Sequence, residues 1–121
     1  MPEIQKEDNY LELKAENIIE DGYIKLRLDI DNENEDKIEY PFVIDLYRKE
    51  EKDSSRMLLL KQLFENKEEV LNWEFKDFLI EQGIFYNYYF KYNDNGYQSE
   101  PFGNIEIMGD FEDIFLYDGK R

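Results

Sequence analysis

Clusters of carboxylates are the most evident candidates for a functional site in this chain. The first ligand to consider for them is a divalent cation. Residues 29 to 36 read DIDNENED, and hard cations such as Ca²⁺ are bound by clustered oxygen atoms. In an EF-hand loop starting at Asp29, however, Asn34 stands where the glycine belongs and Tyr40 where the bidentate glutamate belongs. The run fails as an EF-hand, which leaves two interpretations, a solvated acidic turn or an irregular calcium site.

Acid–base catalysis is the second chemistry that carboxylates could perform. The pairs Glu50-Glu51 and Glu68-Glu69 occupy charged stretches that are expected to be loops, and adjacent loop positions do not converge on a substrate. The chain contains no histidine and no cysteine, which excludes a serine–histidine–acid triad, a thiolate nucleophile and disulfides within it. We therefore expect no enzymatic activity, and we assign no catalytic, cofactor-binding or metal-binding residues.

Aromatic rings offer a third possibility, because exposed rings stack on sugar faces and the chain has ten tyrosines. Strict alternation from Ile84 to Tyr92 predicts a strand that turns four rings toward a core, namely Tyr86, Tyr88, Phe90 and Tyr92. Three tyrosines are left as surface candidates for a glycan platform, namely Tyr47, Tyr89 and Tyr97. A carbohydrate-binding sandwich is thus one alternative function.

The charge of the chain limits its partners. Thirty acidic residues face fifteen basic ones, giving a net charge of −15 without a lysine or arginine patch. Such a field repels phosphate backbones and anionic membranes, so we expect neither nucleic acid nor membrane as a partner. An acidic protein can also imitate duplex phosphates, which makes a DNA-mimic inhibitor of a nucleic-acid-binding protein a second alternative.

Period-two alternation dominates the elements that must position these residues. It predicts strands over Tyr10–Ala15, Tyr23–Ile30, Tyr40–Arg48, Leu71–Phe75, Ile84–Tyr92 and Tyr97–Ile107, the last broken near Pro101 and Gly103. Met57–Phe64 fits a short strand or a helical turn, and charged loops are expected at Asp31–Lys37, Lys49–Arg56 and Glu65–Glu69. Asn95-Gly96 is typical of a tight hairpin turn. The predicted core comprises Leu26, Leu28, Phe42, Ile44, Trp73, Phe75, Tyr88 and Phe90.

One domain is expected from 121 residues. Residues 1–9 are predicted to be a flexible lead-in, residues 10–108 an all-β, antiparallel sandwich of about seven strands, and residues 109–121 a docking segment or the start of a following domain. The amino terminus, MPEIQKEDNY, has no apolar stretch after a basic region, and the chain has no apolar run long enough to cross a bilayer. We expect a soluble protein without a signal peptide.

The order of these segments resembles a fibronectin type III domain, an immunoglobulin-like fold, from about Leu11 to Ile107. The matching residues are Trp73-Glu74-Phe75, Phe78-Leu79, Gly83, 86–90 (YNYYF) and 95–99 (NGYQS). The resemblance implies a structural corner formed by Tyr86, Gly83 and Leu79, in which the Tyr86 hydroxyl bonds back to the preceding backbone. The sequence departs from the family at that corner, where Glu81-Gln82 replaces the usual proline, and it contains no RGD motif.

The end of the chain, residues 111–121 (FEDIFLYDGKR), is similar to a segment that follows such a domain in virion structural proteins of phages infecting Gram-positive bacteria. This resemblance implies a non-enzymatic structural or protein-interaction module of a phage or prophage tail or baseplate, with other virion subunits as partners. The protein would reside in the virion, or in the bacterial cytoplasm before assembly. The residues expected to contact a partner are Phe111, Ile114, Phe115 and Leu116, unless they pack on their own domain. The oligomeric state and whether Arg121 is the natural terminus stay open.

Overall fold

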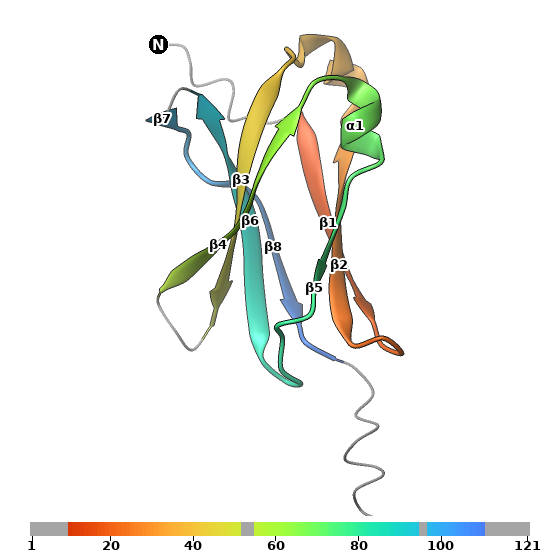
Figure 1. The fold of residues 1–121 in the computed structure, drawn as a ribbon, viewed down its shortest axis with the longest axis vertical. Helices are drawn as coiled ribbons and strands as arrows, with labels where there is room; N and C mark the ends of the chain where they lie inside the picture. Colours follow the sequence, from red (N-terminus) through yellow and green to blue (C-terminus); the bar gives the residue numbers. More distant parts are fainter. Residues whose placement is uncertain (1–9, 52–54, 95–96, 111–121) are drawn as a thin grey trace, which may run out of the picture.

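The computed structural model describes residues 10–51, 55–94 and 97–110, which form two antiparallel β-sheets packed face to face (Figure 1). The strands are β1 (Leu11–Ile18), β2 (Tyr23–Ile30), β3 (Phe42–Glu50), β4 (Arg56–Phe64), β5 (Glu74–Asp77), β6 (Phe85–Asp94), β7 (Tyr97–Gln98) and β8 (Phe102–Met108). A 3-10 helix (Asn32–Lys37) joins β2 to β3, and the short helix α1 (Lys67–Leu71) joins β4 to β5. The prediction of an antiparallel β-sandwich is confirmed at this level.

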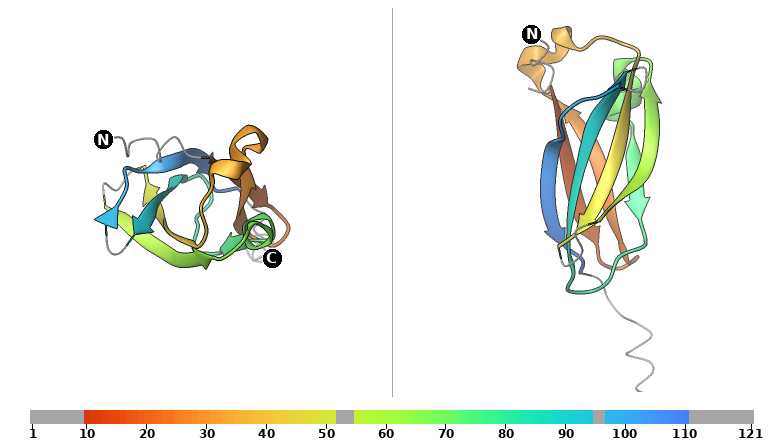
Figure 2. Two further views of the ribbon diagram at one scale, coloured as in Figure 1. Left: turned by 90° about the horizontal axis from the view of Figure 1, so that it is seen from above. Right: turned by 90° about the vertical axis from the view of Figure 1, so that its left-hand side faces the viewer.

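The two sheets contain three and five strands. The smaller sheet has the order β1-β2-β5, and the larger has β4-β3-β6 with both β7 and β8 paired to β6. Viewed from above, the two sheets enclose a single interior (Figure 2). Eight strands are present in the described residues, against about seven predicted, because the stretch from Tyr97 to Ile107 is divided into β7 and β8 around Pro101.

Apolar side chains from both sheets meet between them. Five of the predicted core residues are fully buried, namely Leu26, Leu28, Ile44, Tyr88 and Phe90. The other three, Phe42, Trp73 and Phe75, are partly buried and pack against this cluster. Alternation of inward and outward side chains along β2 and β6 is what places these residues on a common face. This core fixes the register of both sheets, since a slip by one residue would expose it.

The chain between β4 and β5 differs from the prediction. The alternation predicts a strand over Leu71–Phe75 and the charges predict a loop over Glu65–Glu69, but Lys67–Leu71 is helical and β5 begins only at Glu74. The helix is set by its cap, because the Asn66 side chain accepts a hydrogen bond from the Glu69 N–H at 3.0 Å. Leu71 is consequently exposed, whereas Val70 is the buried residue of α1.

The predicted turn at Asp31–Lys37 is a 3-10 helix. Asp31 caps it, with the Glu33 N–H donating to its Oδ1 at 3.1 Å and Asn34 Nδ2 donating to its Oδ2 at 2.6 Å. The ambiguous stretch Met57–Phe64 is a strand and belongs to β4.

Candidate functional site

β4 forms an edge of the larger sheet (Figure 1). Its sequence, RMLLLKQLF, is strongly apolar. Within the described part of the chain β4 pairs only with β3, which leaves the other side of its backbone without a strand partner. Three of its apolar side chains, Met57, Leu58 and Leu63, are 44 to 45% exposed. An edge strand of this length and composition is a ready template for pairing with another strand.

A β-bulge divides β4 into two parts. Leu60 pairs with Leu46 but Leu58 pairs with Tyr47, so Leu59 is the additional residue. Residues that oppose each other on neighbouring strands share a face. The outer face of β4 is therefore formed by Arg56, Leu58, Lys61 and Leu63, and the inner face by Met57, Leu60, Gln62 and Phe64.

Both charges on β4 are positive, although the chain as a whole carries −15. The Lys61 ammonium lies 3.1 Å from Oδ1 and 3.3 Å from Oδ2 of Asp45. The Arg56 guanidinium lies over the ring of Tyr47, 5.3 Å from its centroid. The edge thus combines leucines with two cations, which suits a partner segment that is apolar and acidic.

A polar cluster next to β4 holds the end of the larger sheet together. Asp45 is fully buried although it lies on the outer face of β3, and its Oδ2 accepts hydrogen bonds from Asn93 Nδ2 at 2.9 Å and from Gln98 Nε2. Gln98 also donates to the Tyr47 hydroxyl at 2.9 Å. With Lys61, these donors satisfy the carboxylate, so the cluster attaches β7 to the sheet and leaves Asp45 no role as a ligand-binding group.

The prediction that Tyr47 and Tyr89 are surface aromatics is wrong. Each is only 8% exposed, and their rings stack on each other with centroids 5.3 Å apart and planes inclined by 19°. Lys91 adds a cation 5.6 Å from the Tyr47 centroid. Tyr97 is exposed as expected. Two of the three rings proposed as a glycan platform are therefore covered by their neighbours.

An ion pair joins the two sheets inside the sandwich. Arg48 of β3 and Asp77 of β5 are both buried, and Arg48 Nη1 donates to Asp77 Oδ2 at 2.8 Å. The same nitrogen donates to the Leu79 carbonyl at 2.6 Å, and the Tyr88 hydroxyl donates to Asp77 at 2.6 Å. Burial lowers the pKa of Arg48, but the hydrogen bond and charge of Asp77 outweigh it and raise that pKa overall.

The corner between β5 and β6 is closed by Tyr86. Its hydroxyl accepts a hydrogen bond from the Glu81 N–H at 2.6 Å, which is the backward bond that the sequence predicts. Gly83 has φ of +83°, and its N–H donates to the Gly109 carbonyl at 2.9 Å. Leu79, the third predicted corner residue, has a side chain that is 71% exposed and contributes its backbone instead.

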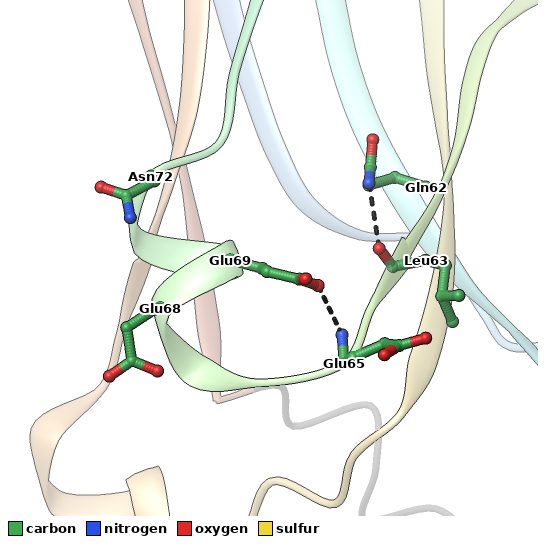
Figure 3. A pocket seen from close by; sticks show the side chains of 6 residues that line it. All are labelled: Gln62, Leu63, Glu65, Glu68, Glu69 and Asn72. Carbon is green, nitrogen blue, oxygen red and sulfur yellow. Dashed lines mark hydrogen bonds between the residues drawn. The ribbon is translucent and has the colours of Figure 1, made fainter.

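Two open pockets lie on the described surface. One, of about 450 Å³, lies between α1 and the end of β4 (Figure 3). Its lining residues are Gln62, Leu63, Glu65, Glu68, Glu69 and Asn72. Glu69 in this pocket already accepts a hydrogen bond from the Glu65 N–H at 2.7 Å, so part of its acidic lining serves to cap the helix.

The second pocket, of about 460 Å³, lies on the outer face of β3, β6 and β8. Its lining includes the half-exposed ring of Phe85 and two amides, Asn87 and Asn104. Glu106 pairs with Asn87 across the strands. The combination of a ring with amide and carboxylate groups is the one feature of this face that would suit a sugar.

The described residues contain no group of three or more carboxylates placed to hold a metal ion, and Asp31 of the acidic run acts as a helix cap. Nor does any helix in the described ranges have the length and apolarity needed to span a membrane. The residues predicted to contact a partner, Phe111, Ile114, Phe115 and Leu116, lie outside the described residues.

Sequence reasoning missed the buried Arg48–Asp77 pair and the β4 edge. No local signal marks the ion pair, since its members are 29 positions apart. The edge did carry a signal, because a run of leucines flanked by Arg56 and Lys61, without one acid, is unusual in so acidic a chain. Comparison with family models, with curated proteins and with solved structures finds no match to this chain.

Proposed function

We propose that this chain is a non-enzymatic protein-interaction module and that it binds its partner through the β4 edge. The observation that carries the proposal is the nine-residue apolar strand at the sheet edge, with one side of its backbone unpaired in the described residues. An added strand would gain main-chain hydrogen bonds from this edge and specificity from its alternating side chains. The absence of histidine and cysteine from the sequence supports a binding role over a catalytic one.

We further propose that the fold is of the fibronectin type III kind. Two features support this. The first is the strand order, with β1-β2-β5 in one sheet and β4-β3-β6-β8 in the other. The second is the hydroxyl bond of Tyr86 to Glu81 at the corner before β6, which corresponds to the tyrosine corner of immunoglobulin-like domains. Such a domain offers a rigid spacing between neighbours, consistent with a structural module.

Assembly into a phage or prophage tail or baseplate is the specific role that we propose for the module. Its support is the resemblance of residues 111–121 to the segment that follows such domains in virion proteins. Particles purified from the organism that carries the gene, and treated with a lysine-reactive cross-linker, provide the test. We expect Lys61, on the β4 edge, to be linked to another chain.

Lys14 is the matched control for this experiment, because it is similarly accessible but lies on β1 in the smaller sheet. It should give no link to another chain. Absence of the protein from purified particles would overturn the virion role. Links of Lys61 only to residues of its own chain would overturn the role of the β4 edge.

Carbohydrate binding is the second candidate, favoured by the pocket that contains Phe85, Asn87 and Asn104. Titration with soluble cell-wall glycans should then perturb the fluorescence or NMR signals of Phe85 and its neighbours. Phe85→Ala should abolish the response, whereas Tyr97→Ala should not. An unchanged signal at millimolar glycan would exclude this function. The hypothesis of a DNA-mimic inhibitor stays a prediction.

A further inference from the structure

We propose that the β4 edge binds residues 111–118 of a second copy of this chain as an added antiparallel strand. The inference rests on the proposed interaction function and names its partner. Residues 111–118 read FEDIFLYD, which combines five apolar or aromatic residues with three acids and no base. β4 has the opposite charge, with six apolar residues, two bases and no acid. The two segments are thus complementary in charge and alike in apolarity.

Complementarity extends to individual positions when the segment runs antiparallel to β4. On the outer face the register pairs Phe111 with Leu63, Asp113 with Lys61, Phe115 with Leu58 and Tyr117 with Arg56. On the inner face it pairs Glu112 with Gln62, Ile114 with Leu60 and Leu116 with Met57. In this register a carboxylate lies opposite Lys61, and an aromatic ring lies opposite Arg56. One further pair joins a carboxylate to the amide of Gln62, and the remaining pairs are apolar. Leu59 is skipped as the bulge residue, as it already is opposite β3.

In this antiparallel register, the position of Asp110 requires that the segment come from another copy. The chain reaches Asp110 beside the start of β6, where the Gly109 N–H donates to the Ile84 carbonyl at 2.8 Å and the Asp110 N–H donates to Asn17 Oδ1 at 3.1 Å. Leu63 lies at the other end of the sheet, beside Val43 and next to the pair Ile44 and Tyr92. Figure 1 shows β8 ending at the bottom of the sandwich and β4 ending at the top, near α1.

The two ends are separated by the length of β6 from Phe85 to Tyr92, which is roughly 23 Å at about 3.3 Å per residue. A single residue spans at most about 3.6 Å. Phe111, which directly follows Asp110, therefore cannot lie opposite Leu63 of its own chain. A second copy whose start of β6 lies near the top of the first copy can supply the segment in this register.

Pairing of β4 with β4 of another copy is the competing arrangement. It would bring two arginines and two lysines along one interface, where like charges oppose pairing. The segment 111–118 instead brings Asp113 opposite Lys61 and the ring of Tyr117 opposite Arg56. Charge therefore favours the carboxyl-terminal segment over a second β4.

Engineered cysteines test the register, because the full chain contains no native cysteine. Two single variants of the full chain, Leu58→Cys and Phe115→Cys, are mixed and gently oxidised. We expect a disulfide between the two different chains as the main covalent product. Leu63→Cys with Phe111→Cys provides a second pair at the other end. The matched control is Leu58→Cys with Ile114→Cys, which the register places on opposite faces, and it should give no such product.

Three results would overturn the proposal. The first is no cross-link in either predicted pair, and the second is a main product that joins two Leu58→Cys chains. The third concerns a double variant that carries Leu58→Cys and Phe115→Cys in one chain, in which the disulfide would form only within that chain. Sedimentation without oxidation gives an independent measurement, in which wild-type protein should be dimeric or larger and Phe115→Asp should be monomeric. Monomeric wild-type protein at all concentrations would also overturn it. If these tests fail while Lys61 is still linked to another chain in particles, the proposed function stands and only the partner segment is wrong.

Discussion

Tyr86 and Tyr88 both face inward on β6, but they use their hydroxyl groups in two different ways. Tyr86 accepts from the backbone of the preceding corner, whereas Tyr88 donates to a carboxylate between the sheets. Both side chains are almost completely buried, so each hydroxyl must be satisfied within the protein. The cost of removing either oxygen depends on the group that is then left without a partner.

Tyr86→Phe removes the acceptor of the Glu81 N–H and should lower the free energy of unfolding by about 1 to 2 kcal/mol. Chemical denaturation followed by tryptophan fluorescence would measure the change. Tyr97→Phe, at an exposed position, is the control and should leave stability unchanged. Equal stability of Tyr86→Phe and wild-type protein would contradict a stabilising role of the corner bond.

Alkaline pH should destabilise the protein because its buried tyrosines resist ionisation. Burial, followed by the hydrogen bond and charge of Asp77, raises the pKa of Tyr88 far above its ordinary value of 10.0, and burial also raises the pKa of Tyr86 and Tyr40. Above pH 10 the unfolded chain loses these protons while the folded protein keeps them. Stability that is fully present below pH 10 should therefore decline as the pH rises toward the folded-state pKa values.

Tyr88→Phe isolates the largest of these contributions. Its stability should fall less steeply than that of the wild-type protein above pH 10, by up to about 1.4 kcal/mol per pH unit. Urea denaturation at a series of alkaline pH values would measure both slopes. Parallel slopes for the two proteins would show that Tyr88 ionises equally easily in the folded and unfolded states.

At the scale of elements, the Arg48–Asp77 pair links β3 of the larger sheet to β5 of the smaller one. Asp77→Ala leaves a buried guanidinium without its carboxylate and should cost about 3 to 5 kcal/mol. The double variant Arg48→Met/Asp77→Leu removes both charges and should recover about 1 to 3 kcal/mol of this loss. Thermal and urea unfolding would compare the three proteins. A double variant no more stable than Asp77→Ala would contradict this electrostatic interpretation.

Asp29→Ala is a suitable control for that series. Asp29 pairs with Arg27 at 3.1 Å on the surface of β2, where both side chains are more than 40% exposed. Solvent screens such a pair, so its loss should cost less than about 1 kcal/mol. The comparison separates the effect of burial from the effect of removing a carboxylate.

Strands with one buried face were predictable from the sequence because alternation reports burial directly. β2 and β6 show this, and the corner bond of Tyr86 followed from the family resemblance. α1 was not predictable in this way. It has only five residues and is set by the cap of Asn66. In the sequence Leu71, Trp73 and Phe75 alternate as in a strand, although Leu71 belongs to the helix and β5 begins at Glu74.

Burial of charged residues was the other feature beyond the reach of sequence patterns. Arg48 and Asp45 lie on opposite faces of β3, and alternation marks each position only as inward or outward. Their burial depends on Asp77, Asn93 and Gln98, which are distant in sequence and come close only through the sheet register. The run of leucines with Arg56 and Lys61 marks β4 as unusual in so acidic a chain, but its place at a sheet edge depends on which neighbours the sheet provides.

The charge of the whole molecule acts against association between copies, since each carries −15. This repulsion operates over a Debye length, about 30 Å at 0.01 M salt and about 8 Å at physiological salt. The contact between Asp113 and Lys61 that we propose at the β4 edge is attractive but involves one pair of charges. Long-range repulsion therefore outweighs local attraction in setting the salt dependence.

We predict that self-association becomes tighter when NaCl is raised from about 20 to about 300 mM, because screening removes the repulsion while apolar contacts of β4 persist. Sedimentation velocity over a range of protein concentrations would measure the dissociation constant. Leu58→Lys should stay monomeric at every salt concentration. The opposite trend, association that weakens with salt, would show that a few charge pairs hold the copies together. A DNA-mimic would differ again, because its complex with a basic protein should weaken with salt while the protein alone stays monomeric.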